Sequence, residues 1–319
     1  MLPRVAFLGS PAFAVPSLGA LVDCADVRLV VTQPDRPAGR GRRLEPTAVR
    51  RAAVEWGLPV RTWERGGRAA LELELAGLDL DVLVVVAFGV ILKPSTLAIA
   101  RRGAINVHAS LLPRWRGVAP IERAIVAGDA QTGVTLMVID AGVDTGPILA
   151  ARAEPIAADD TRVSLAARLA ERGALLLAAE LEAYVAGRTT PVPQPVEGVT
   201  YAPRLTKDEG RIDWQRDATA IADQVRGFYE WPGAFTRLGD LDLKVHVARP
   251  EPAAARPEPA AARGVPGTLV EADPKRGVRV ACGAGALELL EVQLAGKPRV
   301  RATDLARGRV LRAGARLGG

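Results

Sequence analysis

The feature that most constrains the fold is a continuous apolar run over residues 81–87, DVLVVVA. A strand with one face in water alternates apolar and polar side chains, whereas this run has no polar residue between its ends. Such a run is typical of a parallel strand covered on both faces. The N-terminus indicates the same architecture, because a predicted helix over residues 12–24 separates apolar strands at residues 4–9 and 27–32. We therefore predict a doubly wound, Rossmann-like α/β fold with a mostly parallel sheet.

A polar pair lies on a second predicted strand, residues 104–108 (AINVH). Asn106 and His108 are two residues apart, so their side chains share one face. A further strand over residues 133–139 leads into an Asp- and Gly-rich loop that contains Asp140 and Asp144. If the two strands are neighbours, a carboxylate from this loop can lie beside His108. An amide, an imidazole and a carboxylate can stabilise a tetrahedral oxyanion and move a proton during acyl transfer.

The sequence offers no matching nucleophile for a covalent intermediate. A Gly-x-Ser-x-Gly motif is absent, and Cys24 and Cys282 are both remote from His108 in sequence. This favours direct attack by a group on a second substrate. The two histidines and two scattered cysteines form no recognisable ligand set, so we expect no metal. The other histidine, His246, lies in an alternating β segment and is interpreted as structural.

These residues carry a resemblance to a known family. The run Asn106-Val107-His108, followed by SLLPRWRG at residues 110–117 and GVDTG at residues 142–146, resembles the 10-formyltetrahydrofolate-dependent formyltransferases. The likeness spans nearly the whole chain, from VAFLGSP at residues 5–11 to WPG at residues 231–233. It is the resemblance, and not the spacing, that selects Asp144 over Asp140.

The resemblance implies roles for three catalytic residues. Asn106 would donate to the developing oxyanion and His108 would donate to it as imidazolium, while Asp144 would hold that ring protonated and help to take the proton of the amine. It also implies that 10-formyltetrahydrofolate is the formyl donor. Backbone groups of the loop over residues 87–92 would surround its pterin ring. The residues expected to bind it are Phe88, Gly89, Val90, Ile91, Leu92, Ser110, Leu111, Leu112 and Pro113.

The net charge of +6 is concentrated in two segments. Residues 36–51 contain six arginines against one glutamate, and residues 296–319 contain seven basic residues against one aspartate, so the rest of the chain is net acidic. Such segregation favours a polyanion partner, most naturally nucleic acid, although chance clustering in an arginine-rich chain is the alternative. Residues 33–43, rich in Pro, Gly and Arg, predict an irregular loop whose arginines can bind phosphate.

In the family, this loop corresponds to the insertion that contacts the acceptor end of the initiator tRNA. The resemblance therefore implies that the acceptor is the α-amine of methionyl-initiator-tRNA. The expected tRNA contacts are Arg36, Arg40, Arg42, Arg43, Lys297, Arg299 and Arg301. Three enzyme alternatives stay open: formylation of glycinamide ribonucleotide, formylation of an amino sugar, and hydrolysis of the formyl-folate. A non-catalytic nucleic-acid-binding module is the fourth. The two basic segments oppose a small acceptor, and the Asn, His and Asp set opposes a non-catalytic module.

A stretch rich in Pro, Val, Thr and Gly at residues 189–203 predicts a domain boundary. We expect a catalytic domain over residues 1–188, a linker over residues 189–206 and a C-terminal tRNA-binding domain over residues 207–319. Short β segments between Gly and Pro turns suit a small barrel there, and the family carries one of the oligonucleotide-binding (OB) type. The low-complexity residues 249–263 have no assigned role.

The setting is expected to be cytoplasmic and the chain monomeric. The N-terminus passes directly into a strand pattern without the features of a signal peptide. The apolar runs are too short to span a bilayer, and two distant cysteines give no reason to expect a disulfide. We therefore expect no membrane association.

Overall fold

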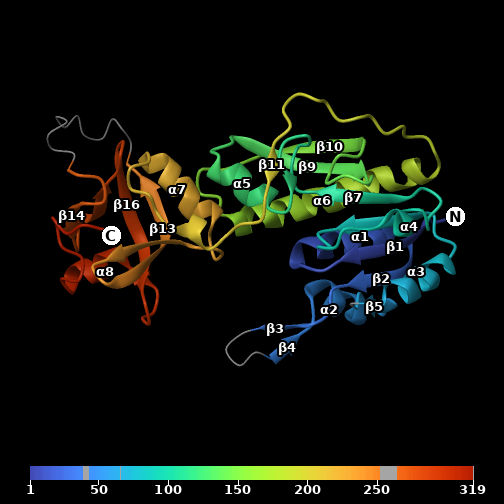
Figure 1. Ribbon diagram of the computed structural model, residues 1–319, viewed down its shortest axis with the longest axis horizontal. Coiled ribbons are helices and arrows are strands. Elements are labelled where there is room, and N and C mark those ends of the chain that lie inside the picture. The colour runs from blue at the N-terminus through green and yellow to red at the C-terminus, as the bar shows by residue number, and fades with distance from the viewer. Residues whose placement is uncertain (39–42, 65, 252–263, 319) are drawn as a thin grey trace. The chain divides into compact units, whose positions relative to one another are not determined.

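The computed structural model describes residues 1–38, 43–64, 66–251 and 264–318 (Figure 1). The chain divides into two compact units, which are described separately. The first unit contains Met1–Pro120, Gln131–Pro155 and Ser164–Pro203. The second contains Ile121–Ala130, Ile156–Val163 and Arg204–Gly319.

The first unit is built on a seven-stranded sheet in the order β10-β9-β7-β6-β1-β2-β5. Five neighbouring strands, from β7 to β5, pair in parallel, and β9 pairs antiparallel with both β7 and β10. The prediction of a mostly parallel sheet is therefore confirmed. The strands are β1 (Arg4–Gly9), β2 (Asp26–Thr32), β5 (Val60–Thr62), β6 (Val82–Val86), β7 (Ala104–His108), β9 (Gln131–Val138) and β10 (Ile148–Pro155).

Helices cover both faces of this sheet. All five residues of β6 are buried, as its continuous apolar sequence predicted. On one face, Leu71 and Leu75 of α3 share a buried cluster with Leu83 and Val85 of β6. On the other face, Gly173 of α6 lies against Val107 of β7, where a side chain at residue 173 would collide. The helices of the first unit are α1 (Val15–Cys24) with a 3-10 turn before it, α2 (Ala48–Glu55), α3 (Arg68–Ala76), α4 (Pro94–Leu97) and all but the start of α6 (Arg162–Val185). Helix α5 (Pro120–Val126) belongs to the second unit apart from Pro120.

The arginine-rich stretch between β2 and α2 differs from its prediction. Short strands β3 (Arg36–Ala38) and β4 (Arg43–Glu45) pair antiparallel, with Pro37 opposite Leu44. The prediction of an irregular loop was wrong for these residues. The two strands form a separate ribbon, and proline, which has no N–H to donate, is tolerated in a strand whose outer edge needs no partner. Residues 39–42 lie outside the described residues.

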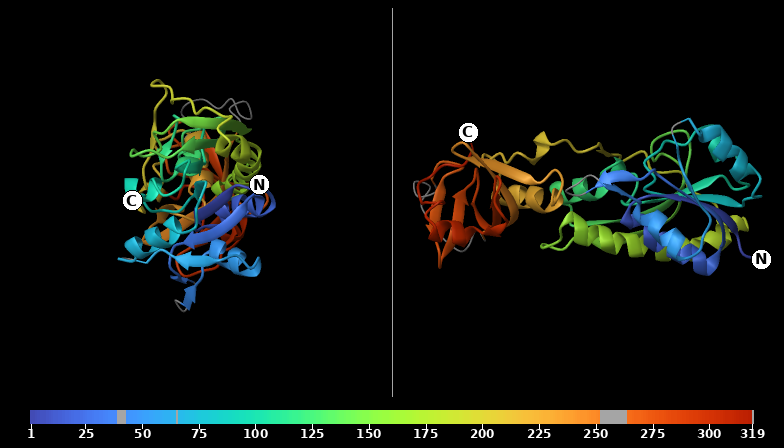
Figure 2. Two further views of the ribbon diagram at one scale, coloured as in Figure 1. Left: turned by 90° about the vertical axis from the view of Figure 1, so that its right-hand side faces the viewer. Right: turned by 90° about the horizontal axis from the view of Figure 1, so that it is seen from below.

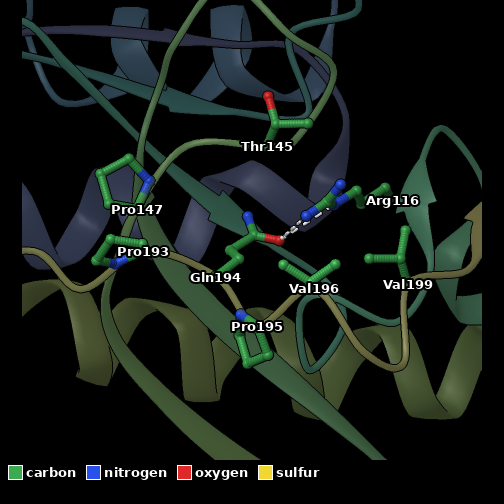
Figure 3. Close-up of a pocket in the computed structure, with 8 residues that line it drawn as sticks. All are labelled: Arg116, Thr145, Pro147, Pro193, Gln194, Pro195, Val196 and Val199. Atoms are coloured by element: carbon green, nitrogen blue, oxygen red, sulfur yellow. Dashed lines mark hydrogen bonds between the residues drawn. The ribbon is translucent and has the colours of Figure 1, made fainter.

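The segment after α6 returns to the first unit's sheet. Val192 exchanges two backbone hydrogen bonds with Ile148 of β10, at 2.7 and 2.8 Å. Further along, β11 (Tyr201–Ala202) pairs in parallel with β8 (Arg116–Gly117). Part of the segment, from Pro193 to Val196, is drawn in Figure 3. Residues 192–202, which we call the connecting segment, therefore lie against the stretch that contains the candidate catalytic residues.

The second unit holds a six-stranded antiparallel sheet, shown in orange and red in the right-hand view of Figure 2. Near the C-terminus, Leu317 forms an antiparallel β-bridge with Leu238, and Arg316 forms one with Thr268. The C-terminal segment therefore pairs with residues at both outer strands of this sheet, in one at the end of the strand and in the other just before it. An antiparallel β unit is confirmed, and the OB-type barrel stays a prediction. The elements are η2 (Asp208–Gly210), α7 (Ala218–Gly227), β12 (Ala234–Leu238), β13 (Leu241–Pro250), β14 (Leu269–Asp273), β15 (Gly277–Ala281), β16 (Ala286–Leu294), β17 (Val300–Arg301) and α8 (Ala302–Arg307).

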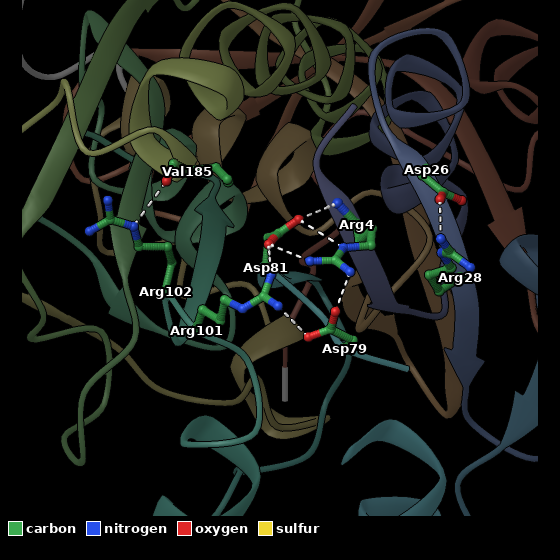
Figure 4. Close-up of polar contacts among 8 residues, drawn as sticks. All are labelled: Arg4, Asp26, Arg28, Asp79, Asp81, Arg101, Arg102 and Val185. Atoms are coloured by element: carbon green, nitrogen blue, oxygen red, sulfur yellow. Dashed lines mark hydrogen bonds and ion pairs between the residues drawn. The ribbon is translucent and has the colours of Figure 1, made fainter. Parts of the chain in front are cut away.

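An ionic cluster fastens the amino ends of β1 and β6 (Figure 4). Asp81 accepts a hydrogen bond from the backbone N–H of Arg4 at 2.8 Å and one from Nη1 of Arg101 at 2.6 Å. Arg4 and Arg101 both also pair with Asp79. Partial burial alone would raise the pKa of Asp81, but the hydrogen bonds from Arg4 and Arg101 outweigh it and lower that pKa.

From this cluster we can predict how the stability of the fold depends on pH. A carboxylate with a lowered pKa stabilises the fold above its unfolded pKa, about 3.9, and that contribution is lost as the pH falls below this value. Asp81→Asn should lower the melting temperature at pH 7 by roughly 3–10 °C, as expected for lost hydrogen bonds to a charged group. The melting temperature of this variant should also fall less than that of the wild type as the pH is lowered from about 5 to 3. Thermal melts across this pH range measure both effects.

The matched control is Asp26→Asn. Asp26 is 43% exposed and pairs with Arg28 alone among the described residues, at 2.7 Å (Figure 4). Exposed pairs of this kind contribute about 0–1 kcal/mol, so this variant should melt close to the wild type. Equal melting temperatures for the two variants at pH 7 would contradict the role given to Asp81.

Candidate active site

Strand β7 places Asn106 and His108 on one face of the first unit's sheet. Asn106 is in register with Val85 of β6, so the two side chains share that face. The side chain of His108 is 6% exposed, and Asn106 is half-buried. Because β6 and β7 are parallel neighbours, the loops that follow them begin at the same edge of the sheet.

The carboxylate that meets His108 comes from Asp144. Oδ2 of Asp144 lies 3.6 Å from Nδ1 of His108. Asp140 instead accepts hydrogen bonds from the N–H of Gly142 at 3.0 Å and from Oγ1 of Thr145 at 2.7 Å. Asp140 therefore stabilises its own loop, and Asp144 is the partner of the histidine.

The route by which Asp144 reaches His108 was not foreseen. Strands β7 and β9 are neighbours as expected, but they are antiparallel, with Ile105 opposite Val138 and His108 opposite Thr135. Strand β9 therefore ends beside the start of β7, at the far end from His108. The loop over residues 139–147 has to fold back along the sheet to bring Asp144 to the imidazole.

His108 is held between two acceptors of the chain. Its Nε2 lies 2.9 Å from the backbone oxygen of Trp115. A carbonyl oxygen can only accept, so Nε2 carries the proton of this hydrogen bond. Nδ1, on the other side of the ring, faces the carboxylate of Asp144.

The position of Asp144 depends on a glycine. Its Oδ2 accepts a hydrogen bond from the N–H of Gly117 at 2.8 Å. Gly117 has φ of 117°, and a Cβ at this position would lie 2.7 Å from the backbone oxygen of Ala202. Only glycine can bring its N–H to the carboxylate with this backbone. Asp144 itself has φ of 51°, a left-handed conformation that is uncommon for a residue with a side chain and is often found at functional sites.

Asn106 is available to a ligand. It is the single asparagine of the chain. Among the described residues, its side-chain amide has no hydrogen bond partner. A half-buried amide without a partner, beside an imidazole and a carboxylate, can donate to an oxygen that becomes negative during a reaction.

The first loop expected to bind the folate is anchored in the core. Phe88 and Leu92 are buried with Leu83 and Val85, and the Phe88 ring packs edge-on against Trp63 at 5.5 Å. Gly89 has φ of 77°, Val90 is half-buried, and Ile91 is 84% exposed. Phe88 and Leu92 therefore fix the loop, which leaves Gly89 and Ile91 at its surface.

The second loop expected to bind the folate is held by Thr135 of β9. Oγ1 of Thr135 donates to the backbone oxygen of Ser110 at 2.7 Å and accepts from the N–H of Leu112 at 3.1 Å. The Ser110 side chain is buried and donates to the backbone oxygen of Arg114 at 2.6 Å. Leu112 is buried, and Leu111 and Pro113 are half-buried. Both loops thus emerge beside Asn106 and His108.

The residues expected to contact tRNA are placed in part. Arg36 is exposed on β3, Arg43 begins β4, and Arg40 and Arg42 lie outside the described residues. In the second unit, Lys297 and Arg301 are exposed and form no ion pair with any residue that the structure describes. The guanidinium of Arg299 pairs with Glu291 and donates to the Tyr229 hydroxyl at 3.0 Å, so its charge is partly compensated.

Two positioning residues were missed from the sequence. Gln194 bonds to the backbone of Asp144, and Oγ1 of Thr200 accepts from the N–H of Trp115 at 2.9 Å. Both lie in the stretch that its composition marked as a linker. Their partners are 50 and 85 residues away in sequence, so no local pattern could have found them. Gln194 also lines a cavity of about 360 Å³ together with Arg116, Thr145 and Val196 (Figure 3).

The described part of the chain shows neither a cluster of metal ligands nor a helix suited to a membrane. Within the described ranges, no three His, Cys, Asp or Glu side chains gather as a set of metal ligands. No helix in the described part of the chain combines the length and the apolar character that crossing a membrane requires.

Comparison with known proteins identifies the family. The formyl transferase family matches residues 4–181, and the formyl transferase C-terminal domain matches residues 204–310. The methionyl-tRNA formyltransferase of Halorhodospira halophila is 50% identical, with 98% of each chain covered. That of Gluconobacter oxydans is 46% identical, over 98% of this chain and 99% of its own.

A solved structure agrees in fold. The N-formyltransferase from Helicobacter canadensis, in complex with folinic acid and dTDP-3-aminofucose, aligns with a TM-score of 0.65 at 18% identity. The alignment covers 91% of this chain and 99% of that one. With sequence matches over both units and this agreement in fold, the chain belongs to the formyl transferase family and, within it, to the methionyl-tRNA formyltransferases.

Proposed function

We propose that this protein transfers the formyl group of 10-formyltetrahydrofolate to the α-amine of methionyl-initiator-tRNA. The observation that carries this function is the identity of 46–50% to methionyl-tRNA formyltransferases over nearly the full length of both chains. The product, N-formylmethionyl-tRNA, serves translation initiation. The alternatives with a small acceptor and the non-catalytic module are not favoured, because neither explains relatives of this identity across both units.

The acceptor needs little activation. A free α-amino group has a pKa near ~7.7–8.0, and esterification of the neighbouring carboxyl lowers it further. Much of the amine is therefore unprotonated at neutral pH. Its nitrogen attacks the formyl carbon, and the carbonyl oxygen becomes an oxyanion. Collapse of this intermediate breaks the bond to N10 of the folate, so that the amine nitrogen loses one proton and N10 gains one.

Asn106 is the proposed donor to the oxyanion. Its amide shares one face of β7 with His108 and has no partner among the described residues. A donor fixed on a strand does not have to reorganise as the charge develops. This preorganisation favours the intermediate over the ground state.

His108 and Asp144 complete the proposed site. Nε2 of His108 is bonded to the Trp115 oxygen, so donation to the oxyanion requires this N–H to change partners when substrate binds. Asp144 faces Nδ1, holds the ring in place and is positioned to help take the proton of the amine. The folate would lie against the two anchored loops, residues 88–92 and 110–113.

The tRNA would be bound by both basic segments. We assign phosphate contacts to Arg36, Arg40, Arg42, Arg43, Lys297, Arg299 and Arg301, with Lys297 and Arg301 favoured over the ion-paired Arg299. We further propose a catalytic domain over residues 1–188, a linker over residues 189–206 and a tRNA-binding barrel of the OB type over residues 207–319. We propose that the protein acts as a monomer in the cytoplasm.

The experiment that tests the function compares three acceptors with 10-formyltetrahydrofolate as donor: methionyl-initiator-tRNA, free methionine and glycinamide ribonucleotide. We expect turnover with the charged tRNA alone, and its loss in His108→Ala. The matched control is His246→Ala, because His246 is the other histidine and bonds only to Gln293 among the described residues. Transfer to a small amine without tRNA would overturn the proposed acceptor.

The oxyanion role of Asn106 gives a sharper prediction. Asn106→Ala should lower kcat by roughly 10²–10³, the typical effect of one lost oxyanion donor. The melting temperature should stay close to that of the wild type, because this amide forms no hydrogen bond with any residue that the structure describes. Steady-state kinetics at saturating folate and tRNA measure the effect. A kcat within a few-fold of the wild type would remove Asn106 from the mechanism.

Salt dependence tests the tRNA contacts. A lysine that neutralises one phosphate contributes a slope of about 0.7–0.9 in the plot of log affinity against log salt. Lys297→Ala should therefore weaken tRNA binding and lower this slope by about that amount. Lys275→Ala removes the same charge from another exposed turn of the second unit and should leave the slope unchanged. Equal slopes for the two variants would exclude Lys297 from the interface.

A further inference from the structure

We propose that Gln194 is a positioning residue that fixes Asp144 against His108, an inference that rests on the function proposed above. Nε2 of Gln194 donates to the backbone oxygen of Asp144 at 2.8 Å and to that of Gly146 at 2.8 Å. Within the described chain, Gln194 is the only residue found to hydrogen bond with the backbone of Asp144. The connecting segment is therefore part of the active site.

The partners of Gln194 settle the orientation of its amide. Oε1 of Gln194 accepts from Nε of Arg116 at 3.1 Å and from Nη2 of Arg116 at 2.7 Å (Figure 3). A guanidinium can only donate and a backbone carbonyl can only accept. The oxygen must then face Arg116, and the NH₂ group must face the two carbonyls. One side chain thus ties Arg116, next to Gly117, to the turn that contains Asp144.

The connecting segment holds both groups that face the ring nitrogens of His108. Gln194 holds the backbone of Asp144, which faces Nδ1 of the ring. Thr200 accepts from the N–H of Trp115, whose backbone oxygen faces Nε2. The connecting segment is itself secured by the two hydrogen bonds between Val192 and Ile148. A half-buried amide in a secured segment is a rigid support for an aspartate at φ of 51°.

The competing interpretation is that Gln194 touches substrate, because it also lines the cavity of about 360 Å³. Val196 lines the same cavity, is 92% exposed and makes no hydrogen bond to the loop of Asp144. A comparison of variants at Gln194 and Val196 therefore distinguishes a contact in the cavity from the positioning of Asp144. A substrate contact would appear in KM, whereas a displaced Asp144 would appear in kcat.

The test is a double-mutant cycle between Gln194→Ala and Asp144→Asn, with Val196→Ala as the control, on the amine that the wild type formylates. In the wild-type background, Gln194→Ala should lower kcat by roughly 10–100-fold, because a shift of about 1 Å in a catalytic group has effects of this size. KM for both substrates should stay within about twofold. In the Asp144→Asn background, Gln194→Ala should lower kcat by no more than about twofold, since the group it positions is already impaired. Val196→Ala should match the wild type.

A second variant tests the donor group of the Gln194 amide separately from its acceptor oxygen. It also keeps the proposal testable if Gln194→Ala folds poorly. Gln194→Glu keeps the size and the acceptor for Arg116 but removes both donors to the Asp144 turn. It should lose kcat as Gln194→Ala does. Wild-type kcat in Gln194→Glu, a full additive loss in the Asp144→Asn background, or a raised KM at unchanged kcat would overturn the proposal. Asp144→Asn with wild-type kcat would overturn it too, by removing the group to be positioned. Failure of the function itself would appear separately, as no formyl transfer by the wild type.

Discussion

The site depends on one contact, the carboxylate of Asp144 between the N–H of Gly117 and the ring of His108. It joins β7, the stretch after it and the loop after β9. Two of the three residues have left-handed backbones, with φ of 51° at Asp144 and 117° at Gly117. A left-handed residue with a side chain costs on the order of 1–3 kcal/mol and persists only where its surroundings fix it. The rest of the first unit supplies those surroundings.

The parallel core of the sheet is the fixed frame for this contact. All five residues of β6 are buried, and Phe88 and Leu92 continue that packing into the loop expected to bind the folate. Thr135 of β9 braces the second loop through Ser110 and Leu112. Protein interiors are close-packed and deform little, so side chains at this edge keep their positions. Asn106, in register with Val85, is therefore held in place by its strand, although its side-chain amide has no hydrogen bond partner among the described residues.

Local sequence signals predicted what local interactions determine. Strand β7 runs from Ala104 to His108 as its alternating pattern indicated, and the shared face of Asn106 and His108 follows from that alternation. Asp144 could not be chosen over Asp140 by spacing, because the choice depends on how a loop folds. The irregular loop expected at residues 33–43 was wrong for β3 and β4, since the pairing of two short strands outweighed a composition typical of turns. The contacts of Gln194 join residues 50 apart and leave no periodic trace.

The antiparallel direction of β9 explains why the connecting segment is needed. In a wholly parallel sheet, both strands would end at the same edge, and a short loop could bring Asp144 to His108 directly. Here β9 ends beside Ile105, so the loop has to return along the sheet to reach His108. Its backbone needs partners from elsewhere, and Gln194 supplies two of them. Selection on the connecting segment should therefore act on Gln194 and Thr200, which hold the two partners of the histidine, more than on the exposed Val196 between them.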